Sequence, residues 1–131
     1  MKEQRKIEVV AKPSEVYDYI KDPRNYLNFD GVTISPNGNS VSATVPVIGE
    51  LSGRLEEVTK GVEVRFLIGR INTSINVRLS QTESGNTDVD LLFKSNPGFP
   101  LNLVVSRYKD QVINGIINHG LAGKWKIKRK A

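Results

Sequence analysis

Hydrophobic and polar residues alternate along most of the first 95 residues, which is the pattern of β-strands with one buried face. Residues 6–11 form the first such run. Between residues 31 and 95 the alternation predicts about six further strands, separated by turns rich in Gly, Asn and Pro. The phase slips at Gly69 and Arg70, which favours two strands with a tight turn or bulge over one long strand. Short turns between successive strands indicate an antiparallel meander.

Two short helical patterns interrupt the strands after the first run. One begins near Ser14, a residue type that caps helices, and stops near Asp22. The other begins at Pro23, whose missing N–H costs nothing in the first turn of a helix.

The period changes to that of a helix over residues 100–121, the only long helical pattern in the chain. A helix of about 20 residues spans roughly 30 Å, enough to cross a small sheet. At 100° per residue, the face expected to be buried contains Leu101, Val104, Val105, Tyr108, Val112, Gly115, Ile116 and His119.

These elements predict an α+β fold in which a curved antiparallel sheet of about six to seven strands wraps around the long C-terminal helix. We expect one domain over residues 1–121, followed by a basic tail over residues 122–131. The sheet and the helix each have one apolar face, so the two faces are expected to meet. The space between them is either a packed core or a ligand cavity.

The composition is that of an ordinary globular protein, with 38% hydrophobic and 25% charged residues among 131. The chain has no cysteine, which excludes disulfides and thiolate chemistry. No apolar run reaches the ~18 residues of a membrane span, and the charged N-terminus does not look like a signal peptide. We therefore expect a cytoplasmic protein, peripheral at the membrane if the tail binds lipid.

The excess positive charge lies in the tail. Five of the 19 basic residues fall within residues 124–130, and the remaining 14 equal the acidic residues in number. A solvated tail is the commonest meaning of such a run, while Trp beside basic residues also suits an anionic lipid surface or another polyanion. The residues expected to make this contact are Lys124, Trp125, Lys126, Lys128, Arg129 and Lys130.

Several short motifs resemble a known family. Residues 11–23 read AKPSEVYDYIKDP, residues 29–32 read FDGV, residues 43–53 read ATVPVIGELSG, and residues 85–89 read GNTDV. With the element order, they resemble the START-like (SRPBCC, Bet v 1-like) superfamily, and most closely the carbon monoxide dehydrogenase G family. The resemblance covers the chain to about Leu121.

The resemblance implies a helix-grip fold with a cavity that holds a lipid, quinone or polyketide-like molecule. Some members of the superfamily are enzymes and many are carriers. The carbon monoxide dehydrogenase G family is associated with membrane attachment through a C-terminal extension, which in this chain is only the short basic stretch.

The candidate ligand-binding residues are the inward positions of the strands and the apolar face of the long helix. They are Val45, Val47, Leu55, Val64, Phe66, Ile68, Ile75, Val77, Val89, Leu91, Phe93, Val105, Tyr108, Val112, Gly115, Ile116 and His119. None of the strand positions is titratable, which favours binding over acid–base catalysis. Gly115 has no side chain where one is expected, so a ligand or Phe66 could approach the helix there. A packed core explains the same pattern.

We expect no catalytic residue, no metal site and no cofactor, because the chain has one histidine and lacks metal-binding and nucleotide-binding motifs. The leading hypothesis is a carrier of a hydrophobic small molecule, or an accessory protein of an oxidoreductase such as carbon monoxide dehydrogenase. One alternative is a polyketide cyclase or aromatase, and another is an interaction subunit without a ligand. The neutral body favours a monomer or weak dimer and argues against nucleic acid. Polar groups that an enzyme could use are Thr73, Tyr108, His119, Arg65 and Arg70.

Overall fold

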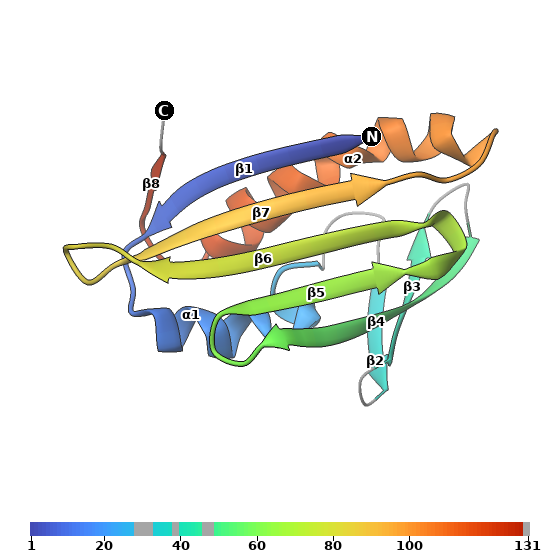
Figure 1. Cartoon of the computed structure of the whole chain (residues 1–131). Helices are drawn as coiled ribbons and strands as arrows, with labels where there is room; N and C mark the ends of the chain where they lie inside the picture. Colours follow the sequence, from blue (N-terminus) through green and yellow to red (C-terminus); the bar gives the residue numbers. More distant parts are fainter. Residues whose placement is uncertain (28–32, 38–39, 46–48, 130–131) are drawn as a thin grey trace.

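The computed structural model describes residues 1–27, 33–37, 40–45 and 49–129, with the backbone alone for 33–37, 45 and 129. Its strands form one antiparallel sheet in the order β2-β3-β4-β5-β6-β7-β1-β8 (Figure 1). The strands are β1 (Lys2–Val9), β2 (Thr33–Asn37), β3 (Ser40–Val45), β4 (Gly49–Thr59), β5 (Glu63–Ile68), β6 (Thr73–Gln81), β7 (Thr87–Ser95) and β8 (Ile127–Arg129). Successive strands pair from β2 to β7, which is the expected meander.

The helices lie on one face of the sheet (Figure 1). Helix α1 (Pro13–Ile20) follows β1, and a single 3-10 turn, η1 (Pro23–Asn25), stands where the second short helix was expected. The long C-terminal helix begins as α2 (Leu101–Asn114) and continues directly into η3 (Gly115–Leu121). The α+β architecture predicted from the sequence is therefore present.

The phase slip in the alternation marks a real break between strands. A 3-10 turn, η2 (Gly69–Ile71), separates β5 from β6, and Asn72 closes it in the left-handed conformation with φ of 44°. Asparagine tolerates this conformation better than most residues do. The turn lets the two halves pair in antiparallel register, with Phe66 opposite Ile75.

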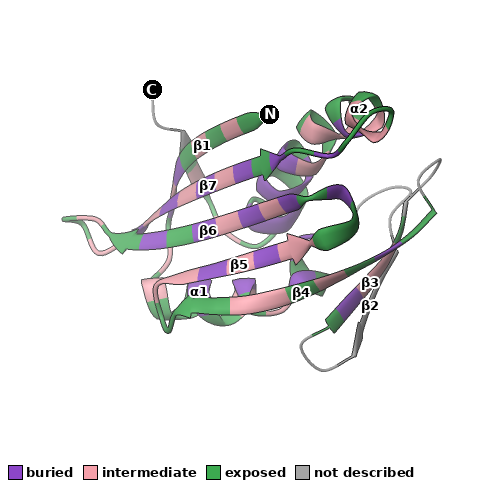
Figure 2. Cartoon of the chain, turned by 45° about the vertical axis from the view of Figure 1, so that its right-hand side comes forward, coloured by how far each residue is buried: buried purple, intermediate pink, exposed green. Residues whose placement is uncertain are grey.

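Burial alternates along the central strands, as Figure 2 shows by the stripes on β5, β6 and β7. The buried positions belong to the face that the helices cover, and mostly polar residues, with Leu67 and Leu92, occupy the opposite, outer face. On the inner face of these strands, the buried hydrophobic residues are Val64, Phe66, Ile75, Val77, Leu79, Val89, Leu91 and Phe93. The period-two pattern therefore identified the inner face correctly.

The end of the long helix differs from the expected α-helix, because η3 is a π-helix with i→i+5 hydrogen bonding. The Ala122 N–H donates to the Ile117 carbonyl at 2.8 Å. A π-helix has more residues per turn than the 3.6 of an α-helix, so positions beyond Gly115 rotate away from the α-helical projection. His119, which that projection placed on the buried face, is exposed, whereas Gly120 and Leu121 are buried.

Part of the tail belongs to the sheet. Strand β8 pairs antiparallel with β1, with Ile127 opposite Val9. Before it, the Trp125 ring lies edge-on against the ring of Tyr19 in α1, with centroids 4.9 Å apart. Lys124, Lys126 and Lys128 are exposed. Within the described ranges, no helix is both long and apolar enough to cross a membrane.

Candidate ligand-binding site

The inner face of the sheet and the long helix bring together most of the candidate ligand-binding residues. The buried strand positions named above face the long helix. On the helix, Val105, Gly115 and Ile116 are buried as well. Ile68, Tyr108 and Val112 are half-buried. Val47 lies outside the described residues, as does the side chain of Val45. The structure therefore assembles one apolar surface from residues far apart in the sequence, and it leaves His119 outside it.

This surface is closed at the η3 end. Ile116 and Leu121 are each 1% exposed. A Cβ added at Gly120 would lie 2.6 Å from the Cβ of Tyr26 and 2.9 Å from its Cα, so helix and turn are in backbone contact there. The Tyr19 hydroxyl donates to the Gly120 carbonyl at 2.8 Å. The tyrosines near η1 therefore fix the end of the helix and leave no space for a ligand beside it.

The opposite end of the surface is less completely covered. Leu55 on β4 lies opposite Phe66 in register, so it points to the inner face, yet it is only half-buried. On α2 the first two turns expose part of Leu101 and Val104, and Tyr108 is half-buried in the third. Apolar side chains directed toward a core but left partly accessible are candidate ligand contacts. The candidate ligand contacts are therefore the half-buried apolar side chains of β4, of β5 and of the N-terminal half of α2.

A glycine on β4 accommodates the largest side chain of this end. A Cβ at Gly53 would lie 2.7 Å from the Cζ of Phe66 and 2.9 Å from the Leu67 carbonyl oxygen. The ring of Phe66 therefore covers the Gly53 backbone within the sheet. Gly115, which the sequence suggested for this contact, is buried at the junction of α2 and η3.

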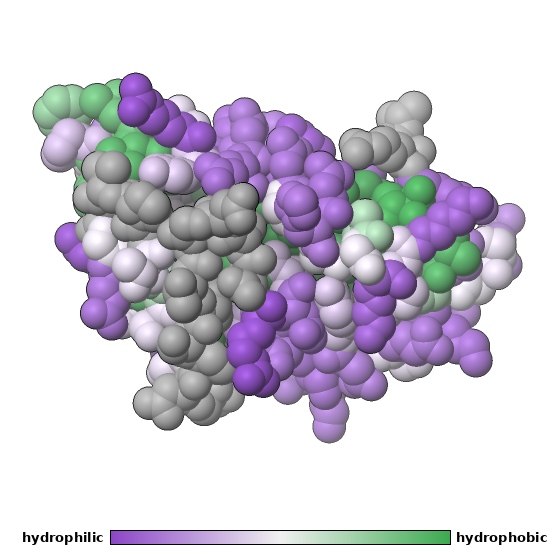
Figure 3. Space-filling view, turned by 180° about the vertical axis from the view of Figure 1, so that it is seen from behind, coloured by the Kyte–Doolittle hydropathy of each residue, from purple (hydrophilic) through white to green (hydrophobic). Residues whose placement is uncertain are grey.

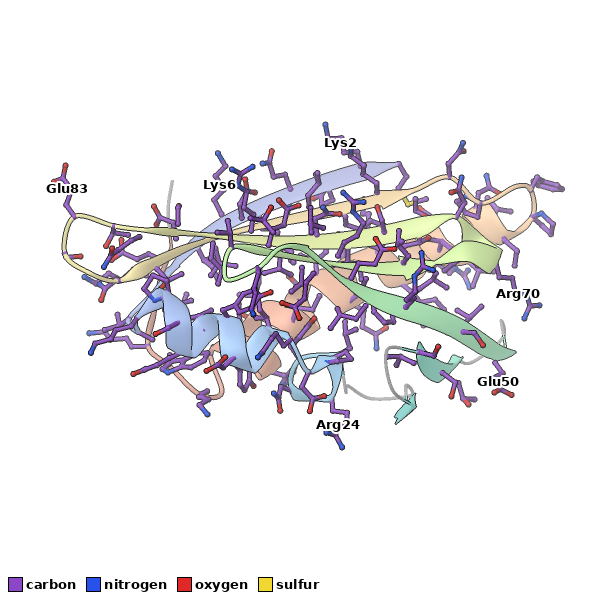
Figure 4. All side chains as sticks on the ribbon, turned by 60° about the horizontal axis from the view of Figure 1, so that its bottom comes forward. Lys2, Lys6, Arg24, Glu50, Arg70 and Glu83 are labelled. Atoms are coloured by element: carbon purple, nitrogen blue, oxygen red, sulfur yellow. The ribbon has the colours of Figure 1, made fainter. Side chains whose placement is uncertain are left out.

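The polar groups considered for catalysis do not converge. The Thr73 hydroxyl is buried and bonded to the Ile71 carbonyl at 2.9 Å and to the Ser95 hydroxyl at 2.6 Å. Arg65 lies on the outer face, 4.0 Å from Glu56. Arg70 extends from the end of the sheet toward solvent, where it donates to the Glu50 carbonyl (Figure 4). With His119 exposed, these side chains occupy separate surfaces and form no shared acid–base site.

One partly buried polar contact was not anticipated from the sequence. The Tyr17 hydroxyl of α1 donates to a carboxylate oxygen of Glu57 on β4 at 2.5 Å. Burial, followed by this hydrogen bond, raises the pKa of the Tyr17 phenol. Glu57 follows the inward positions Gly53 and Leu55 in the strand, and this period is the signal that would have placed it on the inner face. The pair links α1 to the sheet beside the candidate site.

The described part of the chain contains no group of three His, Cys, Asp or Glu side chains placed to hold a metal ion. The side chains of the candidate site are mostly apolar. What it can do chemically is exclude water from a nonpolar molecule and surround it by dispersion contacts.

No protein-family model and no curated protein matches the chain. Its fold matches several solved structures. The protein XoxI from Bacillus cereus is 13% identical, with a TM-score of 0.69 over 93% of this chain and 94% of its own. An HSP90 activator from Plasmodium falciparum is 15% identical, with a TM-score of 0.67 over 98% and 99% of the two chains.

A third match is the Aha1 dimer from Colwellia psychrerythraea, which is 14% identical with a TM-score of 0.61 over 95% and 98% of the two chains. At these identities the likeness shows the fold alone. That fold is of the helix-grip type, as the sequence predicted, whereas the START-like superfamily and the carbon monoxide dehydrogenase G family stay predictions. The chain has the helix-grip architecture of these Aha1-like and XoxI-like proteins.

Proposed function

We propose that this protein binds a hydrophobic small molecule between its sheet and its C-terminal helix, and acts as a carrier or accessory protein. The observation that carries the proposal is the uneven burial of the inner face. The η3 end is tightly packed, while Leu55, Ile68, Leu101 and Val104 at the other end keep part of their apolar surface accessible. An apolar ligand would cover that surface and gain roughly 25 cal/mol for each Å² removed from water.

Binding is favoured over catalysis by the placement of the polar groups. An enzyme of the cyclase type would need a titratable group directed at its ligand. Tyr108 is the one candidate that lies beside the half-buried surface, and Thr73 already hydrogen-bonds to neighbouring protein groups. A ligand held mainly by apolar contacts would itself stay chemically unchanged, which suits transport or presentation to another protein.

A role as an interaction subunit is a second candidate, and exposed apolar residues support it. Phe99 is 83% exposed and Leu103 is 58% exposed where the chain enters α2. Figure 3 shows a hydrophobic area at this end of the molecule, at the upper left. Side chains of this size on a surface are suited to contact another protein. Among the structural neighbours, one is an activator of HSP90 and another forms a dimer, and both properties agree with a role in protein interaction.

The finer versions of the proposal concern the partner. The oxidoreductase partner suggested by the sequence resemblance would dock on the surface formed by Phe99 and Leu103.

The exposed Lys124, Lys126 and Lys128 would add a weak contact to an anionic membrane, each contributing about 1 kcal/mol. Because Trp125 packs on Tyr19, this contact would be electrostatic and lost at high salt. Sedimentation with phosphatidylserine vesicles at low and high salt tests it.

The ligand proposal is tested by native mass spectrometry of the purified protein, with organic extraction of bound molecules, and by titration with an apolar fluorescent probe. The variant Leu55→Trp would fill the half-buried end and is expected to weaken probe binding at least tenfold. Leu92→Trp is the matched control, because Leu92 is equally half-buried but lies on the outer face of β7.

Two results would contradict the proposal. One is a protein that purifies without ligand and binds no apolar probe. The other is equal probe affinity in folded Leu55→Trp and in the control. If Leu55→Trp does not fold, Val104→Trp on the half-exposed side of α2 replaces it. If the ligand site is excluded, the protein would act as an interaction subunit that contacts a partner protein through Phe99 and Leu103. Phe99→Ser is the variant that tests this contact.

A further inference from the structure

Strand pairing gathers three cations on the outer face of the sheet, although they are far apart in the sequence. Lys2 of β1 lies opposite Lys94 of β7, and Lys94 lies opposite Ser74 of β6. The same row continues through Leu67 of β5 to Arg54 of β4. Residues directly opposite one another in a sheet share a face, so Lys2, Lys94 and Arg54 project together. In Figure 4, Lys2 points away from the side that the helices occupy.

This row borders a hollow of about 870 Å³ at the end of the sheet. The lining includes the three cations, the apolar side chains of Leu67 and Ile68, and hydroxyl and amide groups such as Asn96. None of the lining residues is acidic. The volume is within the range of small-molecule sites, roughly 300–1,000 Å³. The hollow thus combines an apolar floor with a cationic rim.

The rest of the outer face has balanced charges, which makes the hollow distinctive. Two rows nearer the middle of the strands, Lys6 lies opposite Asp90, and Asp90 lies opposite Arg78. Arg78 in turn lies opposite Glu63. Within the hollow, Arg54 pairs with Glu56 at 2.6 Å, but Lys2 and Lys94 have no carboxylate within 4.0 Å among the described residues. The N-terminal ammonium of Met1 also borders the hollow, where it donates to the Ser95 carbonyl at 2.9 Å.

We propose that the hollow is a second binding site, which takes a small organic anion with a phosphate or carboxylate head and an apolar body. The head would lie between Lys2 and Lys94, where two ammonium groups supply donors and charge without a competing carboxylate. The body would rest on Leu67, which shares the outer face with Ser74 and Lys94. Hydroxyl and amide groups on the rim would supply neutral hydrogen bonds to the head.

The ligand head in this site lies on the other face of the sheet from the proposed apolar site, although Gly53 and Ile68 at the end of the sheet border both. Its charged side chains point away from the helices, on the opposite face of the sheet from Val64, Leu91 and Phe93. The two sites therefore differ in the ligand they prefer and in the residues that a ligand perturbs. A protein that transports an apolar molecule could sense an anionic metabolite here, and either site can exist without the other.

The test is a ¹⁵N–¹H NMR titration of the whole chain with 1-naphthyl phosphate, with 1-naphthoate and with inorganic phosphate. The two naphthyl probes keep one apolar body and change the head, and inorganic phosphate supplies a head alone. We expect amide shifts at Lys2, Ser74 and Lys94, with the preferred naphthyl probe bound at least tenfold more tightly than inorganic phosphate. The head preference then identifies the ligand as a phosphate or a carboxylate.

The matched variants are Lys2→Gln/Lys94→Gln and Lys6→Gln/Lys60→Gln. Each removes two positive charges, and Lys6 shares both the strand and the face of Lys2 (Figure 4) while Lys60 is exposed in a turn. The first pair is expected to weaken binding at least tenfold and the second less than twofold. Equal losses would reduce the effect to net charge and overturn the proposal, as would the absence of any shift at millimolar probe.

Shifts confined to buried residues such as Val64 and Leu91 would also overturn this proposal. They would place the probe between the sheet and the helix, and the proposed apolar site would then be supported. Conversely, a protein that fails to bind the apolar fluorescent probe but shows the expected shifts at Lys2 and Lys94 would retain this second site and lose the first.

Discussion

The hydroxyl of Tyr19 donates a hydrogen bond to the carbonyl of Gly120 at 2.8 Å and so connects α1 to the π-helix across 101 residues of sequence. The Asn25 carbonyl lies at the same distance from this hydroxyl. The ring of Tyr19 also contacts Trp125. One side chain therefore joins the first helix, the 3-10 turn, the end of the long helix and the tail.

Removing that hydroxyl should loosen the end of the long helix specifically. Tyr19→Phe is expected to lower the free energy of unfolding by about 1 kcal/mol, because a carbonyl of η3 loses a partly buried donor. Hydrogen exchange of the η3 amides should accelerate in this variant. Tyr17→Phe is the control, since the hydroxyl of Tyr17 bonds to Glu57 in β4. Equal exchange at η3 in both variants would contradict the assigned role of Tyr19.

A side chain at position 120 should not be tolerated. Gly120→Ala places a Cβ 2.6 Å from the Cβ and 2.9 Å from the Cα of Tyr26, so the backbone must shift. We expect a loss of about 2–3 kcal/mol in urea denaturation. Gly98→Ala, where an added Cβ meets nothing within 4 Å, should change stability by less than about 0.5 kcal/mol. Similar stability of the two variants would exclude the close contact.

The glycine beneath Phe66 gives an analogous prediction inside the sheet. Gly53→Ala brings a Cβ to 2.7 Å from the ring and 2.9 Å from the Leu67 carbonyl oxygen. Because the ring and the strand must both move, we expect a loss of about 1–3 kcal/mol and weaker binding of an apolar probe. Gly69→Ala, at an open position, serves as the control. An unaffected Gly53→Ala protein would show that Phe66 adapts freely.

Stability should fall in alkaline solution because of Tyr26. Burial, with a smaller effect of the nearby Asp22 carboxylate, raises the pKa of the Tyr26 phenol above its ordinary value of 10.0. Below pH 10 the phenol is protonated in both states and adds no pH dependence. Above pH 10 the unfolded chain releases the proton while the folded chain keeps it, so unfolding becomes easier by up to about 1.4 kcal/mol per pH unit.

Urea denaturation between pH 9 and pH 11 measures this effect. Tyr26→Phe is expected to reduce the slope of stability against pH. Part of the slope should remain, because burial also raises the pKa values of Tyr17 and Tyr19. Identical slopes for the wild type and Tyr26→Phe would mean that the phenol ionises as easily in the folded protein as in the unfolded chain.

The sequence was informative wherever side chains follow a fixed period. Alternation identified the inner face from Val64 to Phe93, and the phase slip located the turn at Gly69. The same assumption of a fixed period failed at His119, because a sequence projection cannot detect the change from α- to π-helical hydrogen bonding. Strand β8 was also missed, although Trp125 and Ile127 alternate with lysines as an edge strand would.

The candidate sites depended on pairing that no local pattern contains. Lys2 and Lys94 become neighbours only because β1 inserts between β7 and β8. The count of charges outside the tail is neutral, so it gave no sign of the local excess of positive charge at Lys2 and Lys94. Likewise, a strand pattern gives the direction of Leu55 but not its accessibility, which depends on what packs against the inner face of β4.

The π-helical end of the long helix has a consequence for comparing this chain with others. A π-helical segment is geometrically equivalent to an α-helix that has gained a residue. A relative with a regular α-helix would therefore match this chain only if a one-residue gap were placed between Gly115 and Leu121. Without that gap, an alignment would pair the exposed His119 with a buried position of the relative. Gly120 would then be shifted by one position from its true equivalent.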